Sequence, residues 1–429
     1  MPRATNLNDA YDVLDPQPID FTTQADFYVE PPPREHDDGE RAPNPMTRIR
    51  KALQTTSAAK MFLAGHVGAG KSTQLRRLAA DPSIEQRFSV VMVRLDMTDL
   101  PFLDPLQLLF HMAIGLYEHG KRLGLFKDDK PWRKHLERLD AALYGGTGLS
   151  ATEGTVGLEI DLFLVKVREE LRVSENRRRE FRTFGETNRT VLIDLLRELS
   201  VEIETALLPK TLLVIIDDLD KVRDAERQDD LFHKGVGTLF APRFRVIYTL
   251  PVAVAFDPSR RELINAVEHL YPERVLEKSP DGFDPLHAFR DDALPFFRDA
   301  VHKRVEPDLV EEEAIRLATA FSGGVVRYVF FLLKEASAIA EMRGATKIDA
   351  KAVRSAVREE RLRLTRGLTR EDYDALLAAH QTHDRKDDAR YQWLQDIGVL
   401  LECYNDDAWY EAHPILWDSL KRRAHDAAG

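Results

Sequence analysis

The sequence has almost no cysteine and no long apolar run. Cys403 is the only cysteine, which excludes an intramolecular disulfide and a zinc site built from several cysteines, and is typical of a reducing compartment. No stretch approaches the about 18 apolar residues that a membrane-spanning helix needs. The opening residues, "MPRATNLNDAYDVLD", lack the apolar segment of a signal peptide. We therefore expect a cytoplasmic protein with no membrane partner.

The chain also lacks an excess of basic charge. Its 61 Lys and Arg residues stand against 72 Asp and Glu residues, which gives a formal net charge of −11. This balance argues against a surface that binds nucleic acid everywhere. The densest basic run, "RRREFR" at 177–182, is flanked by acidic residues and carries little aromatic interleaving. A solvated helix face is therefore favoured there over a nucleic-acid patch.

One glycine-rich stretch stands out against this background. Residues 62–80 read "FLAGHVGAGKSTQLRRLAA" and contain the Walker A spacing G-x-x-x-x-G-K-S at Gly65, Gly70, Lys71 and Ser72. The alternative is a glycine-rich turn without a ligand, but the order of apolar strand, loop and helix favours phosphate binding. Glycines let backbone N–H groups turn toward phosphate oxygens at the positive end of a helix. The predicted nucleotide-binding residues are Gly65, His66, Val67, Gly68, Ala69, Gly70, Lys71, Ser72 and Thr73.

The chemistry of the motif gives two of these residues a role. Lys71 is expected to reach the β- and γ-phosphates of ATP, and the Ser72 hydroxyl to ligate Mg²⁺. ATP and Mg²⁺ are therefore the predicted cofactors.

A second run, "LLVIIDDLD", supplies acidic residues at the end of an apolar strand. Carboxylates there lie at the carboxyl edge of a parallel sheet, where ligands bind. We expect Asp217 to hold Mg²⁺, Asp218 to orient or deprotonate the attacking water, and Asp220 to cap the next helix. The alternative is a strand that ends in a solvated acidic turn, and the upstream Walker A motif favours the catalytic interpretation.

Two further residues are candidates near the nucleotide. Thr249, at the end of "FRVIYTLP", could sense the γ-phosphate, although a threonine of high β-propensity would explain it as well. Arg327, in "SGGVVRYVFF", is expected early in a helix after two glycines, from which its guanidinium could reach the nucleotide. The alternative for Arg327 is a surface arginine.

The fold class expected is α/β, with a P-loop NTPase parallel sheet followed by a helical lid domain and a C-terminal winged helix. Strand-like runs at 60–65, 87–97, 211–222 and 243–251 alternate with helical periods, which indicates parallel strands with right-handed crossovers. After about residue 283 helical periods take over, and two strand-like runs around "NDD" close the chain.

These changes of pattern also suggest domain boundaries. The predicted domains are an extended N-terminal arm at 1–45, a P-loop ATPase domain at 46–282 with an insertion at about 126–188, a helical lid at 283–364 and a winged helix at 365–429. Within the arm, "FTTQADFYV" is apolar enough to pack against the nucleotide domain. Within the insertion, "TVGLEIDLFLVKV" is strand-like.

Together these motifs resemble the AAA+ and STAND branches of P-loop ATPases, over most of residues 47–425. "GHVGAGKSTQLRRL" looks like Walker A and "LLVIIDDLD" like Walker B, and the resemblance places Thr249 at sensor 1. "SGGVVRYVFFLL" is similar to the sensor 2 helix of the initiator and origin-recognition clade, which puts Arg327 on the sensor arginine. The resemblance further implies an arginine finger at or before the fourth strand, where Arg243 is preferred over Arg245. Solvent-facing strand ends are the alternative for both arginines.

The chain departs from these families at two points. Asp218 stands where AAA+ proteins usually carry Glu, and "YTLPV" lacks the arginine that often follows the fourth strand in STAND proteins. Slow or partner-stimulated turnover would follow from either difference.

The function expected is an ATPase switch that controls a protein effector, with self-association as a further expectation. The chain also resembles a group of bacterial AAA-family ATPases that often sit in phage-defence systems, which implies such a role. The first alternative is a DNA-binding initiator or loader, although Lys421, Arg422 and Arg423 are the only basic cluster near the C-terminus and many acids surround it. The second alternative is a scaffold stabilised by bound nucleotide.

Overall fold

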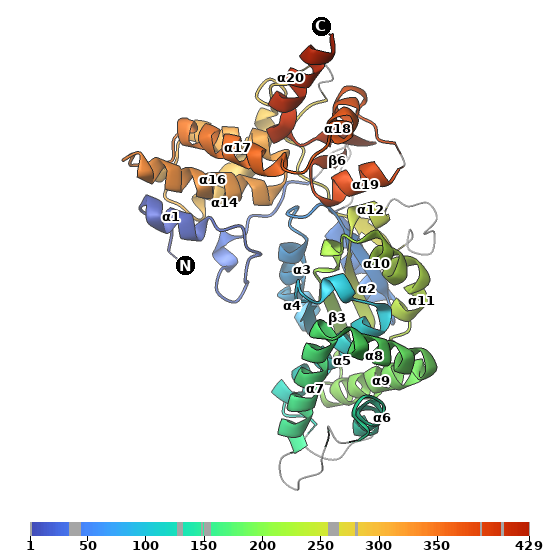
Figure 1. The fold of residues 1–429 in the computed structure, drawn as a ribbon. Coiled ribbons are helices and arrows are strands. Elements are labelled where there is room, and N and C mark those ends of the chain that lie inside the picture. Colours follow the sequence, from blue (N-terminus) through green and yellow to red (C-terminus); the bar gives the residue numbers. More distant parts are fainter. Residues whose placement is uncertain are drawn as a thin grey trace. The chain divides into compact units, whose positions relative to one another are not determined.

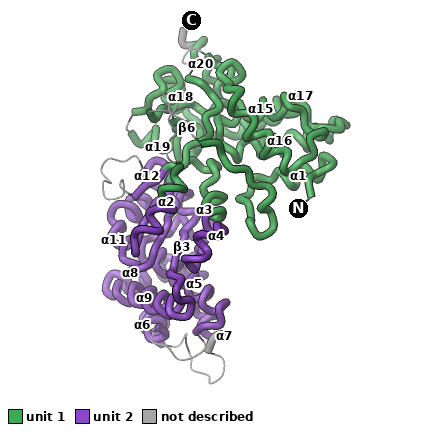
Figure 2. The backbone as a smooth tube through the Cα atoms, turned by 180° about the vertical axis from the view of Figure 1, so that it is seen from behind, with its two compact units in different colours: residues 1–48, 64–77, 269–429 green, residues 49–63, 78–268 purple. Residues whose placement is uncertain are grey.

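The structure is a computed structural model that forms two compact units (Figure 2). Unit 1 comprises residues 1–48, 64–77 and 269–429, and unit 2 comprises residues 49–63 and 78–268. The residues that the structure describes are 2–33, 44–126, 132–146, 149, 156–255, 266–278, 282–386, 388–404 and 407–428. Each unit is described by itself.

Unit 2, of which strand β3 and several helices are labelled in Figure 1, is built on a sheet with the strand order β2-β3-β4-β1-β5. Its strands are β1 (Lys60–Ala64), β2 (Phe88–Arg94), β3 (Thr211–Asp217), β4 (Arg245–Leu250) and β5 (Val267–His269). The registers of β2 with β3 and of β3 with β4 are parallel, so the carboxyl ends of these strands share one edge. The four predicted strands are confirmed. β5 was not predicted, because three half-buried residues are too short to show a period.

Helices cover this sheet, with α5 packed on β2 and α9 on β3. The helices of unit 2 are α4 (Pro82–Glu85), α5 (Pro105–Arg122), α6 (Arg133–Tyr144), α7 (Val156–Val173), α8 (Glu175–Thr187), α9 (Arg189–Ala206), α10 (Ala225–Asp229), α11 (Val236–Leu239) and α12 (Val252–Ala255). Helices α2 (Pro45–Thr55) and α3 (Lys71–Ala79) each cross from one unit to the other.

The strand predicted within the insertion is wrong. Residues 156–173 form helix α7. The buried residues of this stretch recur at helical spacing, and they are Ile160, Phe163, Leu164, Val167 and Leu171. Two short apolar alternations imitated a strand, but the full run of 18 residues buries one face of a helix.

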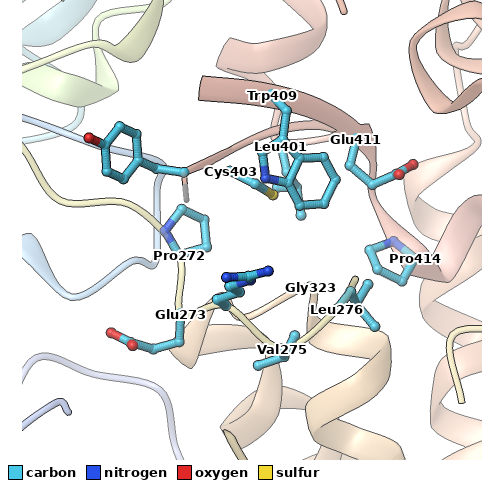
Figure 3. Close-up of a pocket in the computed structure, with 12 residues that line it drawn as sticks. Pro272, Glu273, Val275, Leu276, Gly323, Leu401, Cys403, Trp409, Glu411 and Pro414 are labelled. Atoms are coloured by element: carbon cyan, nitrogen blue, oxygen red, sulfur yellow. The ribbon is translucent and has the colours of Figure 1, made fainter. Parts of the chain in front are cut away.

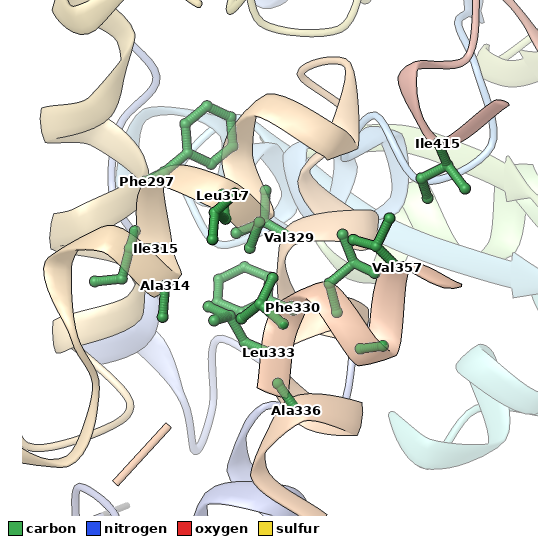
Figure 4. Packing of buried hydrophobic residues seen from close by; sticks show 14 of the residues in the cluster. Phe297, Ala314, Ile315, Leu317, Val329, Phe330, Leu333, Ala336, Val357 and Ile415 are labelled. Carbon is green, nitrogen blue, oxygen red and sulfur yellow. The ribbon is translucent and has the colours of Figure 1, made fainter. Parts of the chain in front are cut away.

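Unit 1 contains the helical region and the C-terminal region. Its further elements are α14 (Leu294–His302), α15 (Glu312–Ser322), α16 (Val326–Met342), α17 (Ala350–Leu364), α18 (Arg370–Thr382), α19 (Ala389–Asp396), β6 (Leu400–Tyr404), β7 (Ala408–Ala412) and α20 (Trp417–Ala428). Helices α15, α16 and α17 pack on one another around a common apolar core that includes Leu317, Phe330 and Val357 (Figure 4). In the C-terminal region, two helices precede the antiparallel hairpin β6–β7, which is the order of elements in a winged helix.

The N-terminal arm is not extended throughout, contrary to the sequence prediction. Residues 7–13 form helix α1, whose N-terminus is capped by the Asn6 side chain, which accepts from the Asp9 N–H. This helix packs on α16, since Leu7, Ala10 and Leu14 lie on one face and are buried in the same apolar cluster as the lid helices. Three apolar residues do not make a sustained period, so this helix could not be predicted from the sequence. Residues 34–43 of the predicted arm lie outside the described residues.

The predicted fold class is confirmed: the chain is an α/β protein with a parallel sheet, a P-loop after β1, a helical lid and a C-terminal winged helix. Among the helices of the described residues, none is both long and apolar enough to cross a membrane.

The packing of α1 on the lid predicts a large effect of a small change in the arm. Leu14 is fully buried, so Leu14→Ala should lower the free energy of unfolding by about 2–4 kcal/mol. Met342 is 79% exposed at the end of α16, and Met342→Ala should change it by less than about 0.5 kcal/mol. Urea unfolding of the full chain provides the measurement. Equal effects of the two substitutions would show that the arm is not part of the lid core.

Candidate functional site

The phosphate-binding motif forms the expected loop between β1 and α3. Gly65, Gly68 and Gly70 have positive φ values of 150°, 94° and 104°, a region that side chains other than hydrogen disfavour. A Cβ atom on Gly65 would lie 2.3 Å from the Leu270 carbonyl oxygen, and one on Gly68 would lie 2.7 Å from the Arg327 Cβ. Glycine is therefore required at these two positions by both conformation and space.

The side chain of Lys71 folds back onto the loop that precedes it. Its side chain is buried, and the Nζ donates to the carbonyl oxygens of Gly65 at 2.6 Å and His66 at 3.0 Å. Ser72 and Thr73 follow in the first turn of α3, both half-buried. The loop thus places one cation and two hydroxyls at a helix N-terminus, which is the donor set that binds phosphate and a hard cation.

The N-terminal arm contacts the helix that follows the loop. The Ile19 N–H donates to Thr73 Oγ1 at a long 3.4 Å, and the Arg76 guanidinium donates to the Pro18 carbonyl at 2.6 Å. Tyr28 lies against the same helix, with its hydroxyl 3.2 Å from the Gln74 amide nitrogen. Of the stretch 21–29, which was expected to pack against the nucleotide domain, Tyr28 makes such a contact at α3. The other two contacts come from the residues just before that stretch.

The lid meets the loop at Arg327, as the sequence suggested. This residue lies in the first turn of α16, after a turn in which Gly323 and Gly324 have φ values of 60° and 83°. Its backbone N–H donates to the Gly68 carbonyl at 3.1 Å. Whether the guanidinium contacts nucleotide stays a prediction.

A contact that the sequence analysis missed joins the loop to the winged helix. The Glu402 backbone N–H, in β6, donates to His66 Nε2 at 2.7 Å. Burial lowers the pKa of His66 to about 3, with the charge of Lys71 as a second cause. Burial also raises the pKa of the Glu402 carboxyl to about 8. No sequence signal identified this pair, because His66 occupies a variable position of the motif and the contact is made by the Glu402 backbone.

A pocket lies beside the hairpin β6–β7 (Figure 3). Leu401 and Cys403 line it from β6, Trp409 from β7, and Pro272 from the segment after β5. Since successive side chains of a strand alternate in direction, Leu401 and Cys403 share the pocket face while Glu402 belongs to the opposite face.

The acidic residues belong to unit 2, at the carboxyl end of β3. Asp217 is the last residue of the strand and is 2% exposed, and its Oδ1 accepts from the Asp218 N–H at 2.9 Å. Asp218 has φ 74°, the left-handed region, and its carboxylate forms an ion pair with Lys221. The structure thus fixes the Asp218 carboxylate beside Lys221, and its role toward water stays a prediction.

Thr249 holds the turn that carries these acids. Its side chain is fully buried at the end of β4. Its Oγ1 accepts from the Leu219 N–H at 2.9 Å and lies 3.5 Å from the Ile216 carbonyl. Thr249 therefore connects β4 with the end of β3 through these hydrogen bonds. A direct contact with the γ-phosphate stays a prediction.

Arg243 and Arg245 lie at the amino end of β4, at the opposite edge of the sheet. Arg243 precedes the strand and is exposed. Arg245 is its first residue and donates from Nε to the Leu53 carbonyl at 2.8 Å and from Nη1 to Thr211 Oγ1 at 3.0 Å. β4 has six residues, so about 17 Å separates its two ends. The structure does not bring Arg243 together with Thr249 or the acids of its own chain.

Comparison with known proteins points to replication proteins. No family model matches the chain. In sequence, 138 residues are 24% identical to ORC1-type DNA replication protein 1 of Halobacterium salinarum, and they cover 32% of this chain. The chain thus spans 40% of the length of this curated relative.

The structure resembles several solved structures along most of its length. The ORC2 protein of Aeropyrum pernix, in ADPNP and ADP complexes, has a TM-score of 0.44 at 14% identity over 94% of this chain and 97% of that chain. The ORC1 protein of the same organism in complex with DNA has a TM-score of 0.42 at 15% identity, over 96% and 98%. CDC6p of Pyrobaculum aerophilum has a TM-score of 0.39 at 14% identity, over 95% and 99%. The STAND and defence expectations stay predictions.

The different surroundings of the two acids predict separate effects. Asp217→Ala removes the predicted metal ligand and should abolish the tightening of ATP binding by Mg²⁺. Asp218→Asn should keep the fold and ATP binding but lower turnover at least tenfold, because asparagine tolerates the left-handed conformation but cannot act as a base. Calorimetry with and without Mg²⁺, together with phosphate release, measures both effects. The reverse pattern would show that the two roles are exchanged.

Proposed function

We propose that the chain is an ATP-binding and ATP-hydrolysing switch of the initiator type. One observation carries the proposal: the P-loop bonds directly to the lid through Gly68 and to the winged-helix hairpin through His66. A ligand that changes the conformation of this loop therefore acts on both segments at once. The sequence similarity to an archaeal ORC1-type replication protein supports the initiator type.

The proposed chemistry follows from the sequence motifs. The loop N–H groups and Lys71 bind the phosphates, and Arg327 contacts them from the lid. Asp218 orients the attacking water, and Thr249 fixes the turn that carries Asp218. Ser72 and Asp217 supply the oxygen ligands that suit Mg²⁺, which neutralises charge that develops on the phosphates.

The proposed output is the binding of duplex DNA through the winged helix. Residues 365–429 contain 8 Lys and Arg and 13 Asp and Glu, so this region makes few phosphate contacts. Lys421, Arg422 and Arg423 are the basic cluster, and Arg423 already contacts Asp374 at 3.4 Å. Three contacts would give a slope of about −2.7 in a plot of log K against log salt.

The ATP site is tested by Lys71→Ala. The substitution removes the positive charge that is expected to bind the phosphates. It also removes two hydrogen bonds to loop carbonyls, so we expect ATP affinity to fall at least a hundredfold. Lys278→Ala is the control, because this lysine lies outside the motif. Calorimetry gives the affinities, and circular dichroism confirms the fold. ATP binding by Lys71→Ala at the strength of the natural chain would contradict the assignment.

The DNA output is tested by fluorescence anisotropy with a labelled duplex, at several salt concentrations and with ATP or ADP bound. We expect weak binding that depends on the nucleotide and has a slope no steeper than about −3. Replacing Arg422 with Ala should make the slope about one unit shallower. Binding that is absent with both nucleotides would instead favour a protein effector as the output of the switch.

Arg243 is exposed, so a second copy of the chain can reach it. We therefore expect that hydrolysis needs two copies. We propose that Arg243 of one copy completes the site of the next, so Arg243→Ala should keep ATP affinity and lose most turnover. Mixing it with Lys71→Ala chains, which carry an intact Arg243, should restore activity. Turnover against protein concentration and light scattering with ATP provide the measurement. Turnover per chain that does not depend on concentration, from a species that stays monomeric, would sink this proposal.

A further inference from the structure

The P-loop in this chain is packed closely against its neighbours. Residues Gly65 and Gly68 have no room for a side chain, since Leu270 lies against the first and Arg327 against the second. His66 lies between them and is 3% exposed. The loop therefore has little space in which to move without displacing its neighbours.

His66 is held at both ends. Its carbonyl accepts from Lys71 Nζ at 3.0 Å, and its ring accepts from the Glu402 N–H at 2.7 Å. The first bond ties the residue to the cation that is expected to bind phosphate. The second ties it to strand β6 of the hairpin. One residue thus connects the phosphate-binding lysine with the winged helix.

The second bond also fixes the proton on the histidine ring. Because Nε2 accepts, the proton of the neutral ring sits on Nδ1, which is buried and has no hydrogen-bond partner among the described residues. The neighbouring His413 resembles it: the ring is fully buried, Nδ1 faces the Ile415 N–H at 3.4 Å, and Nε2 has no partner among the described residues. Burial lowers the pKa of each ring to about 3, so both are neutral at neutral pH.

Unpaired buried donors cost free energy. The closed junction of His66, Glu402 and His413 therefore combines one short hydrogen bond with two ring N–H groups and a carboxyl group that have no partner among the described residues. Water would satisfy these groups if the junction opened. Such an arrangement suits a contact that forms and breaks, rather than one that is permanent.

We infer that the hydrogen bond between His66 and Glu402 is a latch that holds the winged helix against the P-loop and that ATP opens. The inference rests on the proposed function and adds the regulation of the same site. ATP phosphates compete for Lys71, which then leaves the His66 carbonyl. Residue 66 is released at that end, shifts with the loop, and loses the Glu402 N–H. The winged helix is freed for its partner only when ATP is bound.

Thermodynamic linkage gives the latch a signature that a purely structural contact lacks. If ATP opens the latch, the closed latch must oppose ATP binding to the same extent. Removing the latch should therefore tighten ATP binding even though it removes a contact. His66→Leu keeps the approximate volume and deletes the acceptor. The net value of one hydrogen bond corresponds to a change of about two- to tenfold.

The first measurement is the affinity for the non-hydrolysable analogue ADPNP with Mg²⁺, by calorimetry on the full chain. We expect His66→Leu to bind two- to tenfold more tightly than the natural chain. His66→Gln, whose amide oxygen can still accept from the Glu402 N–H, should bind more weakly than His66→Leu. His119→Leu is the matched control, because it deletes a comparable 2.7 Å bond, to the Ser89 hydroxyl, outside the loop. It should leave the affinity unchanged.

The second measurement needs no variant: hydrogen exchange of the Glu402 amide in the natural chain. Exchange should be slow without nucleotide and at least fivefold faster with ADPNP, whereas in His66→Leu it should be fast in both states. If His66→Leu fails to fold, the natural chain alone decides the matter.

The outcomes separate the latch from the proposed function. ADPNP binding by the natural chain without faster exchange at Glu402 would overturn the latch and leave the ATP site standing. Weaker binding by His66→Leu would make His66 a merely structural residue and also overturn it. A natural chain that binds no ADPNP would overturn the proposed function, and the latch with it.

Discussion

The backbone of the loop between β1 and α3 is the constraint on which unit 1 depends. Its carbonyl at Gly68 receives a hydrogen bond from the lid, and its histidine ring receives one from the hairpin. These segments are far apart in sequence, and the His66–Glu402 pair is separated by 336 positions. Because Leu270 lies against Gly65 and Arg327 against Gly68, a shift of the loop at these two positions would displace its neighbours. Two discrete arrangements of such a packed loop are the physical requirement for coupling between sites.

The acidic residues of the proposed active site lie on a strained turn. Asp218 adopts a left-handed conformation that costs a residue other than glycine about 1 kcal/mol, and Thr249 supports the turn through the Leu219 N–H. Strain of this kind persists where surrounding contacts over-determine the geometry. The ion pair with Lys221 further fixes the position of the carboxylate.

Much of this architecture could be predicted from local sequence patterns. The P-loop, the four longer strands, the helix that begins before Arg327 and the closing hairpin each depend on neighbours within about ten residues, so their patterns are legible. Helix α7 was misread because short alternations of apolar residues occur in both strands and helices. Helix α1 was missed because its packing partner lies on α16, which no local pattern can reveal.

The site shows the same division between local and distant information. Gly65, Lys71 and Asp217 belong to motifs whose spacing is set by the chemistry of phosphate binding and metal binding. The contact of His66 with β6 depends on a backbone N–H, which is the same for every residue type except proline. Arg243 was selected by resemblance, and the structure adds only that it is exposed at the far edge of the sheet. Contacts made by the main chain leave no trace in the sequence.

The position of helix α1 has a consequence for biosynthesis. Asp15, just after this helix, pairs with Lys334 of α16 across 319 positions of the chain. At translation rates of about 5–20 residues per second, the first helix waits between about 15 and 65 seconds for its partner to be made. During that time Leu7 and Leu14 have no lid to cover them. The burial of these two side chains is therefore a late step of folding, which follows the synthesis of the lid.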